Sequence, residues 1–293
     1  GRQGPGCCIR LWSPAEQQRR PTFSPPELLL ADPQPVVMEL AAWGAGLGDA
    51  LPWLDPPPQA ALQEGQGELK SLGILNQDGR LSGIGQQLTR LGVHPRLGLL
   101  MVEARRHGCS RLGCDLAALL SDRDPLPVAA VGCDLEARLE AMQQQKRCRP
   151  LRELSRQLER QLARLEIDRV PDSHGIDSVQ LILTAFPSWL AVQRPGQTGR
   201  YRLRQGRGAI LRPGDPLSGS DALAVARLDM GQRDTRIQLA LPLSRERVDK
   251  LALQQGEWLD QVVWDDNAGR IRAERQLKLG ELVLRQEAQP APS

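Results

Sequence analysis

The amino-acid sequence predicts a multidomain protein of the α+β class. Apolar residues recur at three- and four-residue steps up to about residue 171, which is the period of helices. After residue 177 they alternate or run together over short spans between Gly, Pro and Asp turns, which is typical of strands. A length of 293 residues suits two or three modest domains. We therefore expect a winged helix, then a helical bundle, then a small antiparallel β-sheet or barrel.

Residues 25–93 carry the winged-helix pattern of two helices, a small hairpin and a further helix. The capping-box spacing Ser24-Pro-Pro-Glu27 and the pair Asp32-Pro33 both predict helix starts. The proline run in "WLDPPPQAAL" precedes the next helix. A turn at Asn76-Gln-Asp-Gly79 then joins two short apolar pairs as a hairpin, and Ser82 can cap the following helix.

Residues 94–172 are expected to form a domain of separate helices. Two short antiparallel helices precede residue 121, separated by a break at Gly108. A longer helix lies between Pro150 and Pro171, where a leucine stripe indicates a buried face. Its flank repeats arginine every fourth residue, at Arg152, Arg156, Arg160 and Arg164. Like charges at this spacing repel one another unless glutamates or an outside anion compensate, and Glu153, Glu159 and Glu166 supply part of that compensation.

Residues 173–286 are expected to form the β-rich region, with a helix inserted near Val248–Gln254. The sequence "DDNAG" departs from a calcium loop and predicts a tight turn between strands. The polar, proline-bearing residues 287–293 are expected to be a disordered tail.

Composition excludes several classes of protein. The net charge of +3 permits an anionic partner without requiring one. No apolar run is long enough to span a bilayer, so we expect a cytoplasmic protein with no membrane partner. The six cysteines show no secreted-scaffold spacing, and His107, Cys109 and Cys114 do not have the usual spacing of metal ligands. We expect reduced, mostly packed thiols and no metal site.

Catalytic motifs are weak. None of the four lysines follows a glycine, so the chain has no phosphate-binding loop of the Gly-Lys-Ser/Thr type. The glycines of "WGAGLG" follow a helix instead of a strand, which argues against dinucleotide binding. The only grouping for nucleophilic catalysis is Asp172-Ser-His174, and three neighbours in sequence rarely converge on one reacting atom.

Binding remains the better interpretation of the β-rich region. Arg200, Arg202, Arg204 and Arg207 lie beside Tyr201, and small five-stranded barrels often bind single strands by combining a basic groove with aromatic stacking. An ordinary solvated face explains the same residues equally well at this stage.

Several motifs carry a family resemblance. The start "GRQGPGCCIRLWS" resembles the end of the last motor motif of DEAH-box helicases and the strand after it. The stretches "LGILNQDGRLSGIGQQLTRLGVHPRLGLLM" and "HGCSRLGCDLAALLS" resemble the winged-helix and helicase-associated regions of that family. Later stretches, "AFPSWLAVQRPG", "YRLRQGRGAILRPGDPL" and "WDDNAGRIRAERQLKLGELVL", are similar to its bacterial HrpB branch.

The resemblance covers nearly the whole chain and implies part of an ATP-dependent RNA helicase. It implies a remnant of the second motor domain in residues 1–24, a winged helix in 25–93, a helical ratchet in 94–172 and an oligonucleotide-binding barrel in 173–286. Residues 7–11 would be a leftover motor strand, and Pro33 and Pro35 interrupt what is normally a smoother helix.

The resemblance also implies functional roles. Arg2 matches the arginine that approaches the terminal phosphate of the nucleotide, so its role depends on motor domains of the same polypeptide. ATP and Mg²⁺ would be cofactors of the full-length protein and not of this chain alone. Single-stranded RNA is the expected partner, with candidate contacts at Arg152, Arg156, Arg160, Arg164, Arg202 and Arg207.

Two alternatives stay open. The chain could be a non-enzymatic adaptor that binds protein or nucleic acid through the winged helix and the barrel. A much weaker alternative is a hydrolase centred on His174, which would require activity from this chain alone.

Overall fold

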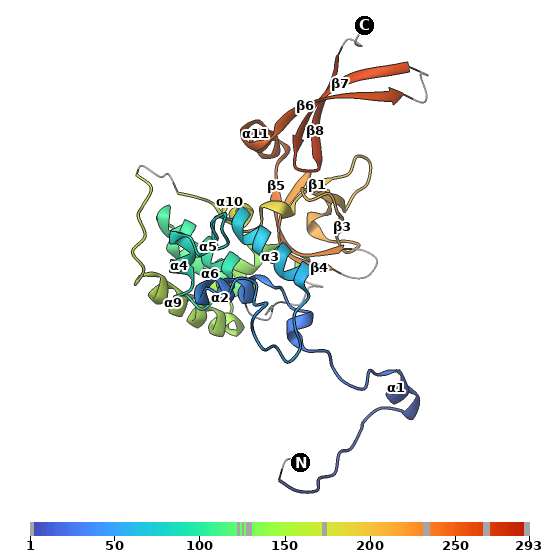
Figure 1. The fold of residues 1–293 in the computed structure, drawn as a ribbon. Coiled ribbons are helices and arrows are strands. Elements are labelled where there is room, and N and C mark those ends of the chain that lie inside the picture. Colours follow the sequence, from blue (N-terminus) through green and yellow to red (C-terminus); the bar gives the residue numbers. More distant parts are fainter. Residues whose placement is uncertain are drawn as a thin grey trace.

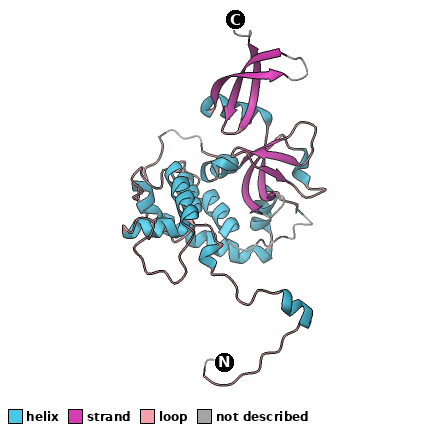
Figure 2. Ribbon diagram, turned by 45° about the vertical axis from the view of Figure 1, so that its right-hand side comes forward, coloured by secondary structure: helices cyan, strands magenta, loops and turns pink. Residues whose placement is uncertain are grey.

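The structure is a computed structural model that describes residues 3–121, 124, 126, 131–171, 175–230, 235–265 and 270–289. Most helices gather in one body, and the strands form two groups beside and beyond it (Figures 1 and 2). The helix Pro14–Arg19 lies instead on the N-terminal extension, and the helix Arg245–Gln255 lies beside the outer strands. The first half of the described chain is helical and the second half is mostly strand, as the change of period predicts.

The N-terminal segment extends away from the helical body (Figure 1). Its one helix is α1 (Pro14–Arg19), which begins at Ser13, whose hydroxyl accepts a hydrogen bond from the Glu16 N–H. The strand expected at residues 7–11 does not form, because no partner strand lies beside it and a lone strand leaves its N–H and C=O groups unpaired. Ile9 and Leu11 are 78% and 91% exposed.

Three helices and a minimal hairpin follow. The capping-box sequence at Ser24 starts only a 3-10 turn, Glu27–Leu29. Pro33 and Pro35 do not interrupt the next helix, because they lie where it begins and its first N–H groups need no intrahelical partner. The predicted hairpin is reduced to a single bridge between Leu75 and Leu81. The helices are α2 (Gln34–Trp43), α3 (Gln59–Ser71) and α4 (Gly83–Leu88).

The next helices form the centre of the helical body. α5 (Pro95–Arg106) packs closely on α6 (Ser110–Ser121), where a Cβ on Gly113 would collide with the Ala104 Cβ. α8 (Leu135–Gln144) leads into α9 (Arg149–Leu162). α9 is shorter than the span up to Pro171 suggested, since tighter backbone turns follow Leu162.

Five strands close into a barrel in the order β1-β2-β3-β5-β4. α10 (Ser178–Ala185) precedes it. The expected antiparallel arrangement holds for every pair except β3 and β5, which are parallel at Ala209–Thr235 and Ile210–Arg236. The strands are β1 (Leu190–Gln193), β2 (Arg200–Leu203), β3 (Gly208–Ile210), β4 (Ala222–Met230) and β5 (Thr235–Leu243).

A second sheet stands apart from the barrel and projects from the molecule (Figure 1). α11 (Arg245–Gln255) confirms the predicted inserted helix and begins at Ser244, whose hydroxyl accepts from the Arg247 N–H. The sheet has the order β6-β7-β8, with β6 (Glu257–Asp265), β7 (Arg270–Leu279) and β8 (Leu282–Gln289). Because β8 pairs with β7 up to Gln289, residues 287–289 are strand and not part of a disordered tail.

The apolar core is nearly continuous. One cluster runs from α2 through the helical body to α10, the outside of the barrel and the second sheet, and a smaller one fills the barrel interior around Tyr201 and Leu203. Among the described residues, no helix is long and apolar enough to cross a membrane.

Candidate nucleic-acid interface

The arginine repeat on α9 lies on a strongly amphipathic helix. Leu151, Leu158 and Leu162 are buried, which turns the arginines at four-residue steps away from the core. Arg156, Arg160 and Arg164 are exposed, whereas Arg152 is half-buried. Arg164 lies just beyond the end of α9, in the turn that follows Leu162, and we refer to all four residues as the α9 arginines.

Arg152 holds the end of the preceding helix. Its Nη1 donates hydrogen bonds to the carbonyls of Met142, at 2.6 Å, and Gln145, at 2.9 Å. Carbonyls at a helix C-terminus lack intrahelical donors and attract cations. The Arg152 guanidinium is therefore engaged within the fold.

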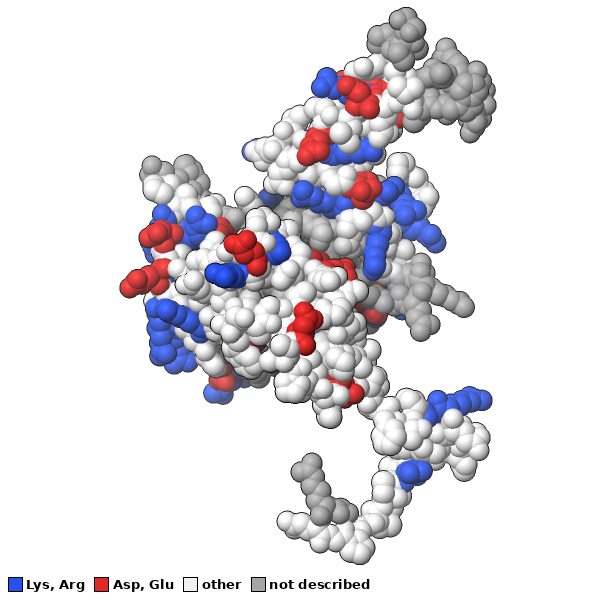
Figure 3. Space-filling view, viewed as in Figure 1, with Lys and Arg blue, Asp and Glu red and all other residues white. Residues whose placement is uncertain are grey.

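The rest of the α9 surface mixes both signs of charge. Arg149 pairs with Glu153 at 2.7 Å, and Arg111 approaches Glu159 at 3.5 Å. A shallow surface beside the helix is lined by Glu153, Glu159 and two of the arginines. Basic and acidic side chains accordingly lie together over this part of the molecule (Figure 3). The glutamates partly neutralise the field that a phosphate would meet.

The barrel presents a different arginine surface because of the strand period. On β2 the exposed fraction alternates, so Tyr201 and Leu203 point into the barrel while Arg200 and Arg202 point out. Arg207 follows on the turn before β3 and is also exposed. Arg194, just after β1, comes beside them because its N–H donates to the Arg200 carbonyl at 2.9 Å.

We call these four residues the barrel arginines: Arg194, Arg200, Arg202 and Arg207. Three of them line a cleft of about 400 Å³ along β2 and β3, and no acidic residue is among the described residues that line it. A Cβ on Gly208 would lie 3.1 Å from the Arg194 Nη2, so glycine at that position leaves room for this guanidinium. Basic side chains gather over the barrel on this side (Figure 3).

Within the described residues, the side chains of Arg194, Arg200 and Arg202 make no hydrogen bond or ion pair. Sequence reasoning singled out Arg202 and Arg207 but missed Arg194. The signal that could have found it is its position at the end of one strand of a hairpin, opposite Arg200.

Tyr201 does not provide the aromatic platform that its position beside the arginines suggests. It is fully buried, and its hydroxyl lies 3.0 Å from the carbonyls of Leu217 and Ser220, one of which accepts its proton. Burial raises the Tyr201 pKa to about 12, so the hydroxyl stays protonated at neutral pH. Tyr201 is a core residue of the barrel.

The remaining sequence candidates are placed as follows. Arg2, Asp172, Ser173 and His174 lie outside the described residues. No cluster of histidine, cysteine, aspartate or glutamate in the described part of the chain could hold a metal ion. Burial raises the pKa of the Cys114 thiol to about 12, so the thiol stays protonated at neutral pH.

Comparisons with known proteins find similarity to bacterial ATP-dependent RNA helicases. Residues 255–289 match the family model described as the connector region of the ATP-dependent RNA helicase HrpB. The chain is 32% identical to ATP-dependent RNA helicase HrpB of Escherichia coli over all of its length, but spans only 35% of that relative. It is 35% identical to ATP-dependent RNA helicase HrpA of the same organism over 43% of its length, covering 10% of HrpA.

The fold gives the same answer. A crystal structure of the E. coli DExH-box NTPase HrpB superimposes on the entire chain with a TM-score of 0.76 and 30% sequence identity, and the chain covers 35% of it. The two proteins therefore share the same overall fold over the length of this chain. The chain corresponds to a C-terminal portion of an HrpB-type helicase.

Proposed function

We propose that this chain is the nucleic-acid-handling part of an ATP-dependent RNA helicase, and that it guides single-stranded RNA while motor domains of the same polypeptide supply ATP-driven movement. The observation that carries the proposal is the positive charge of Arg194, Arg200 and Arg202, whose side chains have no hydrogen-bond or ion-pair partner within the described residues. Arginine binds phosphate through a planar fork of donors, and such contacts dominate affinity for nucleic acid.

The architecture supports specific roles for each part. Residues 25–93 serve as a winged helix, residues 94–172 as a helical ratchet, and the barrel as an oligonucleotide-binding fold. The closed barrel with a basic outer face is the feature that favours the last assignment, since such barrels bind single strands along a charged groove.

The two arginine surfaces contribute unequally. The barrel arginines are the main phosphate contacts. Arg156, Arg160 and Arg164 add weaker attraction, because Glu153 and Glu159 lie among them.

ATP and Mg²⁺ belong to the full-length helicase in this proposal. None of the described residues is assigned to the nucleotide. Arg2 would approach its terminal phosphate.

An adaptor without a motor is the second candidate, and the projecting sheet favours it. Val262 and Val283 are 62% and 43% exposed on β6 and β8, where a protein partner could cover them.

Fluorescence anisotropy of a short single-stranded RNA with this chain, repeated across a salt series, tests the proposal. If three or four phosphates are neutralised, log Kd changes with log salt with a slope of about 2 to 3, because each contact on a single strand contributes about 0.7. Absence of binding at low salt would refute RNA handling by this chain and favour the adaptor.

A further inference from the structure

A second cleft lies on the helical body, separate from the barrel arginines. Its volume is about 540 Å³, and it is bounded by α5, α9, the 3-10 turn Pro187–Trp189 and the loop before α2. Leu158 of α9 lines it on one side and Trp189 on another. None of the residues assigned to RNA above lies in this cleft.

One wall of the cleft is a rigid aromatic platform. The rings of Phe186 and Trp189 stack with their centroids 4.8 Å apart and 19° between their planes. The Arg96 guanidinium carbon lies 5.4 Å and 5.8 Å from the two ring centroids. Both distances lie within the range of cation–π contact, which helps to fix the two rings in place.

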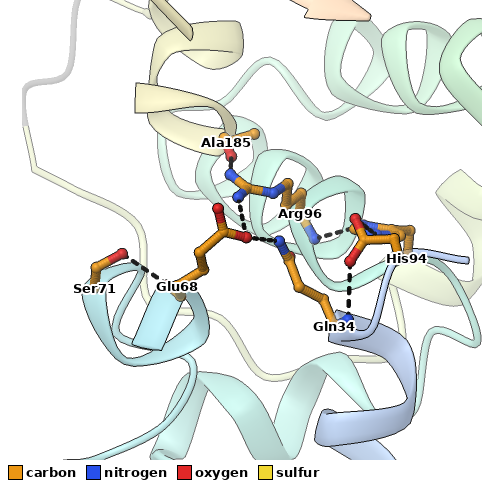
Figure 4. Close-up of polar contacts among 7 residues, drawn as sticks. Gln34, Glu68, Ser71, His94, Arg96 and Ala185 are labelled. Atoms are coloured by element: carbon orange, nitrogen blue, oxygen red, sulfur yellow. Dashed lines mark hydrogen bonds and ion pairs between the residues drawn. The ribbon is translucent and has the colours of Figure 1, made fainter. Parts of the chain in front are cut away.

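Arg96 is itself fixed in place. It is 4% exposed, and its guanidinium donates to the Ala185 carbonyl at 2.7 Å and to Glu68 at 2.9 Å (Figure 4). Glu68 also accepts from the Gln34 amide. The platform is therefore tied to α2, α3 and α10, and a ligand would meet it already formed.

Hydrogen-bonding groups lie at the rim. The Arg96 backbone N–H donates to His94 Nδ1 at 3.3 Å (Figure 4). The His94 proton therefore lies on Nε2, which donates to Asp32 at 3.2 Å. Burial opposes ionisation of Asp32, but the His94 and Gln34 hydrogen bonds outweigh it and lower the Asp32 pKa. The exposed Asp32 carboxylate keeps free lone pairs to accept from a ligand.

We propose that this cleft binds one nucleobase of the single-stranded RNA, stacked on Trp189 with its polar edge toward Asp32. The inference rests on the proposed function and adds a base-binding position to it. Every base has a π-face that stacks on an aromatic ring, and the amino and imino groups of bases are donors that a carboxylate accepts. Half-buried Trp189 lines the cleft, and its indole N–H makes no hydrogen bond in the described chain.

The test combines NMR with RNA binding. Adenosine monophosphate is titrated into the ¹⁵N-labelled chain. The indole signal of Trp189 is identified as the one that is missing from the spectrum of Trp189→Phe. We expect this signal to shift. We also expect Trp189→Ala to weaken binding of a ten-nucleotide oligoadenylate about tenfold, because removal of a stacking aromatic side chain typically lowers affinity by this amount. Trp189→Phe keeps an aromatic ring and should change the affinity less than about threefold. Trp43→Ala is the matched control, because Trp43 is 74% exposed and lies outside the cleft.

The outcomes separate this inference from the proposed function. If Trp189→Ala binds RNA as tightly as the wild type and the wild-type indole signal does not shift, the base site is wrong. RNA handling by the chain would remain supported. An indole shift with no RNA binding supports the base site and refutes RNA handling. If the Trp189 indole signal shifts with phenylalanine amide and not with adenosine monophosphate, the base site is wrong. The cleft would then bind a side chain of a protein partner. The wild-type NMR titration decides even if Trp189→Ala does not fold.

Discussion

The α9 arginines and the barrel arginines look alike in sequence and differ in the folded protein. Both are runs of arginine on one face of a regular element. On α9, Arg152 is bonded to carbonyls of a neighbouring helix, and glutamates lie among the others. On the barrel, Arg194, Arg200 and Arg202 have no partner within the described residues, and no acidic residue lines the cleft.

The difference shows that the positions of hydrogen-bond acceptors, and not the number of arginines, decide whether an arginine surface can bind an outside anion. An engaged guanidinium contributes to the stability of the fold. An unengaged one keeps its donors for an outside anion. Three predictions test this distinction.

The largest effect is expected from charge reversal on the barrel. The triple variant with Arg194→Glu, Arg200→Glu and Arg202→Glu should bind single-stranded RNA about 100-fold more weakly at low salt. Because three phosphate contacts are lost, the slope of log Kd against log salt should fall by about 2. Fluorescence anisotropy across a salt series measures both quantities.

The matched control reverses the same kind of charge on α9. Arg156→Glu with Arg160→Glu should lower RNA affinity less than about threefold, because the nearby glutamates already offset these arginines. If the α9 variant lost as much affinity as the barrel variant, the proposed ranking of the two surfaces would be wrong.

An intermediate effect, on stability, is expected at Arg152. Arg152→Ala removes two hydrogen bonds from a charged group to carbonyls and should lower the free energy of unfolding by about 1–2 kcal/mol. Urea denaturation measures it. Arg156→Ala serves as the control and should cost less than about 0.5 kcal/mol, as exposed substitutions usually do. Equal losses for the two variants would contradict the role of Arg152 as a helix cap.

The smallest effect is expected from Arg247, an arginine whose partner is acidic. Asp177, at the start of α10, accepts from Arg247 at 2.6 Å and 3.1 Å and from the Gln180 N–H at 2.9 Å. Burial raises the Asp177 pKa, but these bonds outweigh it and lower the pKa below 3.8. The resulting stabilisation is complete above 3.8 and is lost as the pH falls through the lowered pKa.

Denaturation of the wild type and Asp177→Asn across pH measures this contribution. The wild type should be slightly more stable at pH 6, by a few tenths of a kcal/mol because the pair is exposed, and the difference should vanish in acid. A difference that persists unchanged in acid would show that the charge of Asp177 is not its source.

Much of the fold follows from local patterns. The change from helical to strand period near residue 177, the helix at Arg245–Gln255 and the outward direction of Arg202 are all readable in sequence, because periods of 3.6 and 2 select a face without reference to distant residues. Local signals failed where a partner was needed. Residues 7–11 have the apolar character of a strand and no neighbour to pair with, and the strands after Glu257 separate into a sheet of their own.

The candidate site divides in the same way. Local sequence patterns are enough to place arginines along one side of α9 and on the outside of β2, and the motifs carry the resemblance to HrpB-type helicases. The burial of Tyr201, the helix-capping role of Arg152 and the position of Arg194 on the barrel surface depend on how distant segments pack. The physical reason is that a side chain's direction depends on its own backbone, whereas its partners come from segments that only folding brings within hydrogen-bonding distance.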